Sequence, residues 1–467
     1  MYRGVGANGP GDPSRSEPSE SSARAIVSNL TELADQDSPE SPEHLRCLVS
    51  QGGQPMACLI MIGARGVSRR ERSDEISLIS LALIFVFALN SFVIGCASTD
   101  RLPPVPLAIA SKVNVDIPDA RFYPDTDRQR MAALGLQAYK RAKAAHHGNL
   151  PTAYFLAISG GGDDGAFGAG LLNGWSARGD RPTFTLVTGV STGALSAPFA
   201  FLGGEYDAKL KQVYTDTNAG DIFSKRSLIA AVANDAMTDT TPLRNIIASF
   251  VDEAMIKRIA EEYAKGRLLL IMTTNLDQGR SVIWNIGAIA ASNYPGKRDL
   301  IIDILRASAA IPGLFPPVML DVSIDGQRYQ EMHVDGGAVA QAFLYPPTLN
   351  LKANSARYGI ERKRVAYILR NGRLFRPEEN VKRQTLSIAT QAISTMTATS
   401  GVNDTYRMYV TTKRDGVGFN LAYIDSDFTV PYKGPFDQGY MRSLFAYGYA
   451  KGKAGYHWHK TPPGYQE

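Results

Sequence analysis

A serine between two glycines stands at the junction of an expected strand and an expected helix. The run G-V-S-T-G at 189–193 follows the apolar stretch 184–188 and precedes small, helix-forming residues. The flanking glycines permit a sharp turn that pushes the serine hydroxyl out at the carboxyl end of a sheet, where a helix amino terminus stabilises negative charge. Such a run is often only a structural turn, but its position between a strand and a helix favours a catalytic role. We therefore predict that Ser191 is a nucleophile, with Gly189 and Gly193 shaping the nucleophile elbow.

A second glycine-rich turn, G-G-G-D-D-G at 160–165, follows the apolar run 154–159. Between a strand and a helix amino terminus, such a turn directs free backbone N–H groups at one point, where they can hold a phosphate or a transient oxyanion. The glycine spacing also fits a dinucleotide-binding fingerprint. However, the next strand ends in the serine elbow and not in the acidic residue that would bind a ribose. We therefore favour an oxyanion site.

An aspartate at the end of another short apolar strand completes the reactive residues. Asp335 follows Met-His-Val at 332–334 and precedes two glycines that keep the backbone close. Upstream, the segment R-A-S-A-A-I-P-G-L-F-P-P at 306–317 predicts a helix that stops at a proline and an apolar loop after it. Together, the four motifs in this order and at these separations resemble the patatin-like phospholipase family over roughly residues 154–350.

The resemblance implies a three-layer α/β/α fold with a mainly parallel central sheet. It implies a serine hydrolase that cleaves carboxylic esters of lipids, as a phospholipase A or a lysophospholipase does, through an acyl-enzyme intermediate. By position, Ser191 and Asp335 match the family's Ser–Asp dyad, and Gly160, Gly161 and Gly162 match its oxyanion loop. An exposed aspartate, with a pKa of roughly 3.9, would be a feeble base. Burial among the apolar strand residues would raise that pKa towards useful basicity.

The chain departs from the family pattern at two places. Asp164 stands where an arginine or lysine is usual, and Asp163 precedes it. Two acids beside an anion site predict repulsion of phosphate headgroups, with acyl transfer unaffected. Gln341 stands where an asparagine is common, and it keeps an amide. Leu314 and Phe315 either line an acyl channel or pack the core.

Two alternative functions remain open. An α/β-hydrolase esterase with a Ser–Asp–His triad requires its three residues in that chain order, and Ser191, Asp335 and either His457 or His459 satisfy it. Both histidines lie in the last eleven residues, where we expect a loose tail. The alternative outside the enzymes is a non-catalytic, lipid-binding surface lipoprotein, although the chain keeps both reactive residue types.

The first hundred residues carry the pattern of an export signal. Residues 1–60 are rich in Ser, Pro, Gly and acidic residues and are expected to be disordered, or untranslated if synthesis starts at Met61 (or Met56). An arginine cluster and the apolar run 76–95 then lead into Cys96, in a V-I-G-C sequence that resembles a bacterial lipobox. We predict an exported, membrane-associated lipoprotein anchored through lipidated Cys96. The alternative is a retained transmembrane helix, for which the run is long enough.

Composition sets the outer limits of function. Of 467 residues, 44% are hydrophobic, which is enough for a well-buried core. A formal net charge of +5, without a long basic run after residue 110, gives nucleic-acid binding little support. The three cysteines lie in the first hundred residues, and the histidines form no metal motif, so we expect neither a metal nor a cofactor. The expected partners are a lipid or phospholipid substrate and a membrane surface.

Strands and helices alternate along the catalytic region, which supports a mainly parallel sheet. Further strands are expected at 267–274, 365–370 and 418–424. Mostly helical segments at 207–213 and 227–263 are expected to cap the acyl site. In chain order, the expected organisation is a disordered segment 1–60, an export signal 61–96, a Pro-rich tether 97–127, a catalytic domain 128–455 and a tail 456–467.

Overall fold

A computed structural model of the chain describes residues 101–113, 115–225, 238–374 and 381–465. The predicted export signal, including Cys96, and the segment 1–60 lie outside these residues. The strands of the main sheet are β1 (Arg121–Phe122), β2 (Ala153–Ile158), β3 (Leu186–Val190), β6 (Leu268–Asn275), β7 (Arg280–Asn285), β8 (Val318–Ile324), β9 (Gln327–Asp335), β10 (Arg364–Leu369) and β11 (Gly418–Ala422). Two short strands, β4 (Ser224–Lys225) and β5 (Thr238–Asp239), pair separately.

The main sheet has the strand order β1-β7-β6-β3-β2-β10-β11, and β9 pairs with both β6 and β8. Strands β6, β3, β2, β10 and β11 run parallel to one another, whereas β7 and β9 run antiparallel to β6. The prediction of an α/β fold with a mainly parallel central sheet is therefore confirmed. The strands expected at 267–274, 365–370 and 418–424 correspond to β6, β10 and β11.

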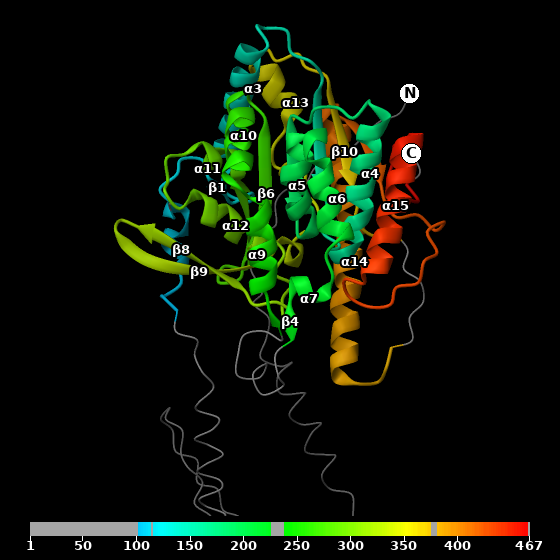
Figure 1. Cartoon of the computed structure of the whole chain (residues 1–467). Helices are drawn as coiled ribbons and strands as arrows, with labels where there is room; N and C mark the ends of the chain where they lie inside the picture. Colours follow the sequence, from blue (N-terminus) through cyan, green and yellow to red (C-terminus); the bar gives the residue numbers. More distant parts are fainter. Residues whose placement is uncertain (1–100, 114, 226–237, 375–380, 466–467) are drawn as a thin grey trace, which may run out of the picture. The chain divides into compact units, whose positions relative to one another are not determined.

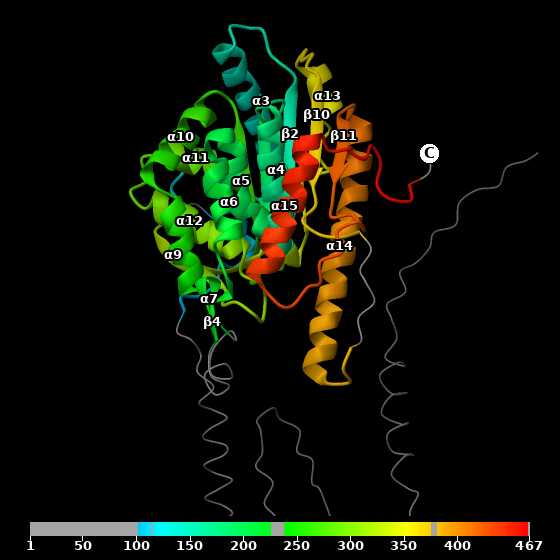
Figure 2. The same cartoon turned by 45° about the vertical axis from the view of Figure 1, so that its right-hand side comes forward.

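Helices cover both faces of the sheet (Figure 1, Figure 2). They are α3 (Arg128–Ala145), α4 (Gly165–Arg178), α5 (Thr192–Leu202), α6 (Asp207–Thr215), α7 (Ala219–Ile222), α9 (Thr241–Phe250), α10 (Glu253–Ala264), α11 (Ile286–Ala291), α12 (Lys297–Ser308), α13 (Leu351–Arg357), α14 (Thr385–Asp415) and α15 (Gln438–Ala454), with single 3-10 turns η2 (Leu107–Lys112), η3 (Gly162–Asp164), η4 (Gly204–Tyr206) and η5 (Gly336–Ala338).

The sheet separates two hydrophobic cores, as β2 illustrates. Side chains alternate between the faces of a strand. Leu156 and Ile158 therefore pack into the core beneath α4, α5, α10, α12 and α15, whereas Phe155 and Ala157 pack into the core beneath α3 and α14. Because both faces are covered, β2 is apolar throughout, as expected of a central parallel strand.

Glycines bring α15 into backbone contact with α4 (Figure 2). A Cβ added at Gly170 would lie 2.1 Å from the carbonyl oxygen of Phe445, and one added at Gly448 would lie 2.3 Å from that of Phe167. Neither position therefore accepts a larger residue without separating the helices. The close packing fixes α4, which begins at the glycine-rich turn.

The described part of the predicted tether, from Arg101 onwards, packs on the domain instead of hanging free. Arg101 donates two hydrogen bonds to Asp277, at 2.9 and 2.8 Å, and the carbonyl of Pro103 accepts one from the amide of Gln330. Strand β1 then extends the sheet beyond β7. Separately, none of the helices in the described ranges is both long and apolar enough to cross a membrane.

The carboxyl-terminal residues also differ from the expected loose tail. Trp458 packs between Trp175 and Tyr367, with ring centroids at 5.0 and 4.7 Å. His459 forms a backbone bridge with Leu421 of β11. Apolar burial and ladder hydrogen bonds thus hold a segment whose prolines and glycine suggested mobility.

Candidate active site

Two strands meet end to end along one edge of β6. In β3, Val190 pairs with Met272; in β9, Asp335 pairs with the next residue, Thr273. Because β9 runs antiparallel to β6, its last residue arrives where β3 stops. This register brings Ser191 and Asp335 together although they are far apart in the sequence.

The backbone at Ser191 has the strained geometry expected of an elbow. Its φ and ψ are 55° and −128°, a combination that non-glycine residues rarely adopt. A Cβ at Gly193 would lie 2.3 Å from the carbonyl oxygen of Ile158, and one at Gly189 would lie 2.5 Å from that of Gly193. The two predicted elbow glycines are therefore required by close backbone approach.

Asp335 is 5% exposed and is held by two hydrogen bonds. The side chain of Ser191 forms one, and the backbone amide of Gly337 donates the other at 2.7 Å. Burial raises the pKa of Asp335 to about 7, although both hydrogen bonds act to lower it. A carboxylate with this pKa is a far stronger base than an exposed one and contacts the hydroxyl that it would deprotonate.

The glycine turn lies against the elbow, but its three amides are not equivalent. A Cβ at Gly160 would lie 3.1 Å from the Cβ of Ser191. The amide of Gly160 donates to the carbonyl oxygen of Gln341 at 2.9 Å, so the prediction that it serves as an oxyanion donor needs correction. Among the described residues, the amides of Gly161 and Gly162 have no acceptor, and Gly162 lines the same pocket as Ser191.

Asn371, at the end of β10, fixes the glycine turn. Its amide donates to the hydroxyl of Ser159 at 2.8 Å, and its side chain donates to the carbonyl of Ser159 at 2.9 Å. The side-chain oxygen accepts a hydrogen bond from the amide of Gly168 in α4 at 3.2 Å. Gly161, with φ of 151°, lies so close that a Cβ there would approach the carbonyl oxygen of Asn371 to 1.9 Å.

The two unusual acids of the glycine turn hold a loop that precedes α15. Asp163 accepts hydrogen bonds from the amide of Phe436, at 2.9 Å, and from the side chain of Tyr432. Asp164 accepts one from the hydroxyl of Tyr440 at 2.8 Å. Burial raises the pKa of Asp163. These carboxylates therefore have a structural role at the site as well as a charge.

An apolar pocket of about 80 Å³ opens beside Ser191. Helices α5, α6, α7, α9, α12 and α15 contribute to its wall, so segments expected to cap the site do line it, although 226–237 lies outside the described residues. Phe315 both lines the pocket and packs in the core, whereas Leu314 is not part of the pocket wall. The principal apolar side chains include Leu195, Phe199, Leu243, Ile247, Phe315 and Phe436.

His459 of the alternative triad does not reach Ser191, and His457, two residues before it, is exposed, whereas Ser191 is buried. His459 pairs with β11, and β2 and β10 lie between β11 and β3. Four strand spacings of about 4.8 Å place its backbone roughly 19 Å from that of β3. The His459 ring stacks on Tyr423 with a centroid distance of 4.7 Å. The triad is therefore not assembled.

A buried polar network supports the strand that carries Asp335. Arg121 donates to Glu331 at 2.8 Å, and Glu331 lies 3.0 Å from the Nε2 of His333. The Nδ1 of His333 lies 2.9 Å from the hydroxyl of Thr273, which accepts from Trp284 at 2.8 Å. Burial lowers the pKa of His333, which is therefore neutral. The network fits the tautomer in which Nε2–H donates to Glu331 and Nδ1 accepts from Thr273.

Sequence reasoning missed three residues that position the site. Ser308 accepts from the amide of Ser191, Asn371 fixes the glycine turn, and Asp404 accepts from the amides of Gln341 and Ala342 at 2.6 and 3.1 Å. The available signal for Asp404 was its place as the first charged residue after the uncharged run 384–403. Within the described ranges, no group of three or more His, Cys, Asp or Glu side chains is arranged to hold a metal ion.

Comparisons with known protein families and structures gave two similarities. A model of the family described as patatin-like phospholipase matches residues 156–346. The crystal structure of VipD from Legionella pneumophila is similar at 11% sequence identity and a TM-score of 0.33, over 65% of this chain and 67% of that chain. No curated protein matches. Residues 156–346 are therefore similar to the patatin-like phospholipase family.

Proposed function

We propose that this protein is a serine acyl hydrolase that cleaves carboxylic esters of lipids through a Ser191–Asp335 dyad. The observation that carries the proposal is the strand register, which brings Ser191, in the wall of an apolar pocket, next to the buried carboxyl of Asp335. A serine hydroxyl is a weak nucleophile unless a base lies within hydrogen-bond reach. The pKa of Asp335, raised to about 7, suits that role near neutral pH.

In the first half of the reaction, Asp335 takes the hydroxyl proton as the Oγ of Ser191 bonds to the ester carbonyl carbon. The tetrahedral oxyanion receives hydrogen bonds from the amides of Gly161 and Gly162, which have no other acceptor among the described residues. The carbon–oxygen bond to the alcohol then breaks, and Asp335 returns its proton to the leaving oxygen. The acyl group remains esterified to Ser191.

In the second half, Asp335 takes a proton from water as the water oxygen attacks the acyl carbon. The same two amides stabilise the new oxyanion. The bond to the Oγ of Ser191 then breaks, Ser191 recovers its proton from Asp335, and the fatty acid leaves. No histidine is needed, in keeping with the distant position of His459.

The surroundings of Ser191 favour a lipid of phospholipase A or lysophospholipase type with an uncharged or zwitterionic head. The pocket wall is apolar, which suits an acyl chain. Asp163 lines this pocket and is fixed by Phe436 and Tyr432, so it cannot swing away from an anionic headgroup. We expect faster hydrolysis of neutral and zwitterionic lipids than of anionic lipids with the same acyl chains.

A lipid panel with mass-spectrometric detection tests the function. The wild-type chain should release fatty acid, whereas Ser191→Ala should lose activity by at least ~100-fold and keep its fold, because the nucleophile is gone. Ser196→Ala is the matched control, since this serine is buried in α5, the helix that follows Ser191, but bonds to Thr192 and Tyr214. Full turnover by Ser191→Ala would refute the assignment, as would fluorophosphonate labelling at another serine.

The membrane attachment is a separate proposal that rests on the amino-terminal sequence. We propose that Cys96 is lipidated after export. Metabolic labelling with a clickable fatty acid should mark the wild-type chain in membranes and not Cys96→Ser. Equal labelling of both variants, or an intact apolar run 76–95 in the mature protein, would contradict it.

A further inference from the structure

A second apolar pocket, of about 170 Å³, lies on the opposite face of the sheet from the pocket beside Ser191. Its floor is made by the starts of the parallel strands, including Ala153, Leu186 and Leu268, the first residues of β2, β3 and β6. Ser191 follows the other end of β3. At 3.3 Å per residue, the strand places Leu186, in the floor of this pocket, roughly 16 Å from Ser191. The second pocket is therefore not an extension of the first.

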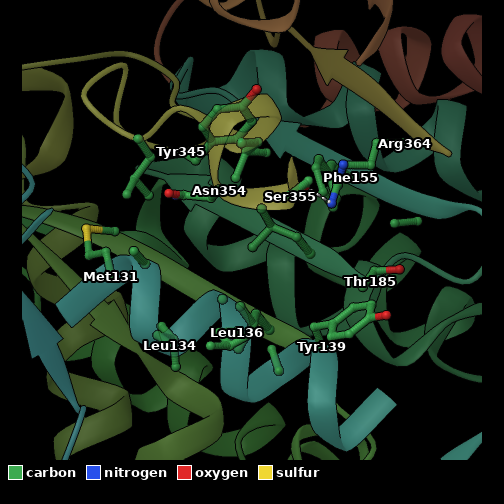
Figure 3. Close-up of a pocket in the computed structure, with 18 of the residues that line it drawn as sticks. Met131, Leu134, Leu136, Tyr139, Phe155, Thr185, Tyr345, Asn354, Ser355 and Arg364 are labelled. Carbon is green, nitrogen blue, oxygen red and sulfur yellow. Dashed lines mark hydrogen bonds between the residues drawn. The ribbon is translucent and has the colours of Figure 1, made fainter. Parts of the chain in front are cut away.

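The interior and the mouth of this pocket differ in chemistry. Figure 3 shows Leu134, Leu136 and Tyr139 of α3 on one side and Tyr345 opposite them, with Arg364 at the far end from Met131. The interior side chains belong to the core beneath α3 and α14. The wall is thus apolar at one end and basic at the other, which matches an amphiphile with one chain and one anionic head.

Two guanidinium groups at the mouth have no carboxylate partner among the described residues. Arg362 donates to the carbonyl of Pro151 at 2.9 Å, and Arg364 donates to the hydroxyl of Ser355 at 2.8 Å, as the dashed line in Figure 3 shows. Burial lowers the pKa of both, and the charge of Arg364 lowers that of Arg362 further. The nearby carboxyl of Asp415 bonds instead to Arg414 and Tyr345.

We propose that this pocket binds a free long-chain fatty acid, with its chain between α3 and the sheet and its carboxylate between Arg362 and Arg364. An anion there would offset the repulsion between the two guanidinium groups, and Arg pairs well with planar carboxylates. The apolar wall would shield the chain from water. If the proposed function holds, the ligand belongs to the same class as the reaction product. The binding site itself does not depend on catalysis.

The test measures binding of free oleate to the full chain after a long-chain fluorophosphonate has blocked Ser191 and filled the first pocket. We expect saturable binding of one oleate. Arg362→Gln and Arg364→Gln should each weaken it by about 10-fold or more, the scale of one charge-assisted hydrogen bond. Lys363→Gln is the matched control, because Lys363 lies between them in sequence and is exposed and outside the pocket wall. Oleyl alcohol should bind more weakly than oleate.

Filling the pocket provides a second, independent variant. Gly135 lines the pocket in α3, and a Cβ there meets nothing within 4 Å, so Gly135→Phe should fold and exclude oleate. Should that variant unfold, a photoreactive fatty acid on the wild type should crosslink to α3 or to 343–358. The proposal would be overturned if oleate showed no saturable binding, or if Lys363→Gln weakened oleate binding as much as the arginine variants do. It would also be overturned if the protein bound anionic vesicles but not free oleate. Absence of fluorophosphonate labelling would count against the proposed function alone, and oleate binding would then be measured on Ser191→Ala.

Discussion

The backbone amide of Ser191 donates a hydrogen bond to the hydroxyl of Ser308 at 3.0 Å, across 117 residues of sequence. The same hydroxyl donates to the carbonyl oxygen of Met272 at 2.7 Å. Ser308 is fully buried at the end of α12, so one side chain joins the elbow, this helix and β6. The strained conformation of Ser191 is therefore held by a contact from outside its own strand–turn–helix unit.

Replacing Ser308 by alanine should impair both stability and turnover. The change leaves the buried amide of Ser191 without an acceptor, which costs about 1–3 kcal/mol. The rate constant kcat should fall more than KM changes, because the nucleophile shifts relative to Asp335. Urea unfolding and steady-state kinetics measure the two effects. Ser443→Ala, at a partly exposed residue bonded only within α15, should change neither. An unaltered kcat for Ser308→Ala would show that the elbow holds its geometry alone.

The pH dependence of kcat/KM should follow the ionisation of Asp335. Burial raises its pKa to about 7, and only the ionised carboxylate can accept the proton of Ser191. The ratio kcat/KM should therefore rise as pH increases through about 7 and level off above it. His333 has a lowered pKa and stays neutral across this range. Measuring kcat/KM against pH with a soluble chromogenic ester checks this. A rise centred near the ordinary carboxyl pKa of roughly 3.9 would contradict it.

The same shift predicts that the proposed base destabilises the fold. A carboxyl whose pKa is higher in the folded than in the unfolded chain stabilises the folded state while protonated, and this contribution is lost as pH rises through about 7. Asp335→Asn is uncharged at every pH. It should therefore resist denaturant better than the wild type in alkaline buffer while losing activity. Asp180→Asn, an exposed carboxyl beside Arg178, is the control. Lower stability of Asp335→Asn throughout would contradict the expectation.

Gly161 and Gly135 should respond oppositely to alanine. At Gly161, with φ of 151°, a Cβ would come within 1.9 Å of the Asn371 carbonyl oxygen, so the turn must move and activity should collapse. At Gly135, in α3, a Cβ meets nothing within 4 Å, and alanine should raise helix stability by up to about 1 kcal/mol. Thermal unfolding and ester hydrolysis measure both. Normal turnover by Gly161→Ala would show that the observed turn geometry is not needed.

The features that local pattern could predict were the strands, the elbow and the fold class. The strands β2, β3 and β6 could be identified from apolar runs of strand length. Each of these strands is determined by the residues of its own short segment. Helix α14 continues without a break to Asp415. The continuation is decided by packing of residues such as Met408 and Tyr409 against the second core, which a local pattern does not show.

The remaining features depend on contacts between distant segments. Gly160 looked like a donor because its amide follows a strand, but the carbonyl of Gln341 already accepts from it. Asp163 and Asp164 were expected to repel phosphate headgroups, yet they also accept hydrogen bonds from Phe436 and Tyr440, which lie 273 and 276 residues further on. The prolines near Pro103 suggested a free tether, although Arg101 and β1 pack on the domain. None of these partners can be read from spacing alone.

Removing one charge of the buried ion pair between Arg121 and Glu331 should destabilise the fold more than removing both. Its charges lie 2.8 Å apart and tie β1 to the strand that ends in Asp335. Glu331→Gln leaves Arg121 buried without a countercharge, which should destabilise the protein by about 3–5 kcal/mol. The double variant Arg121→Met with Glu331→Leu should recover much of this loss, since neither charge remains. Glu261→Gln, which breaks an exposed pair with Arg258, should change stability little.

The same ion pair should make the free energy of unfolding fall at acidic pH. Burial alone would raise the pKa of Glu331, but Arg121 and His333 lower it to about 2. A carboxyl with a depressed folded pKa stabilises the protein above its unfolded value, and this contribution is lost as pH falls from about 4.5 to about 2. Denaturant titrations at a series of acidic pH values should therefore show a steeper loss for the wild type than for the double variant. Parallel curves would mean that other carboxyl groups cause the acid unfolding.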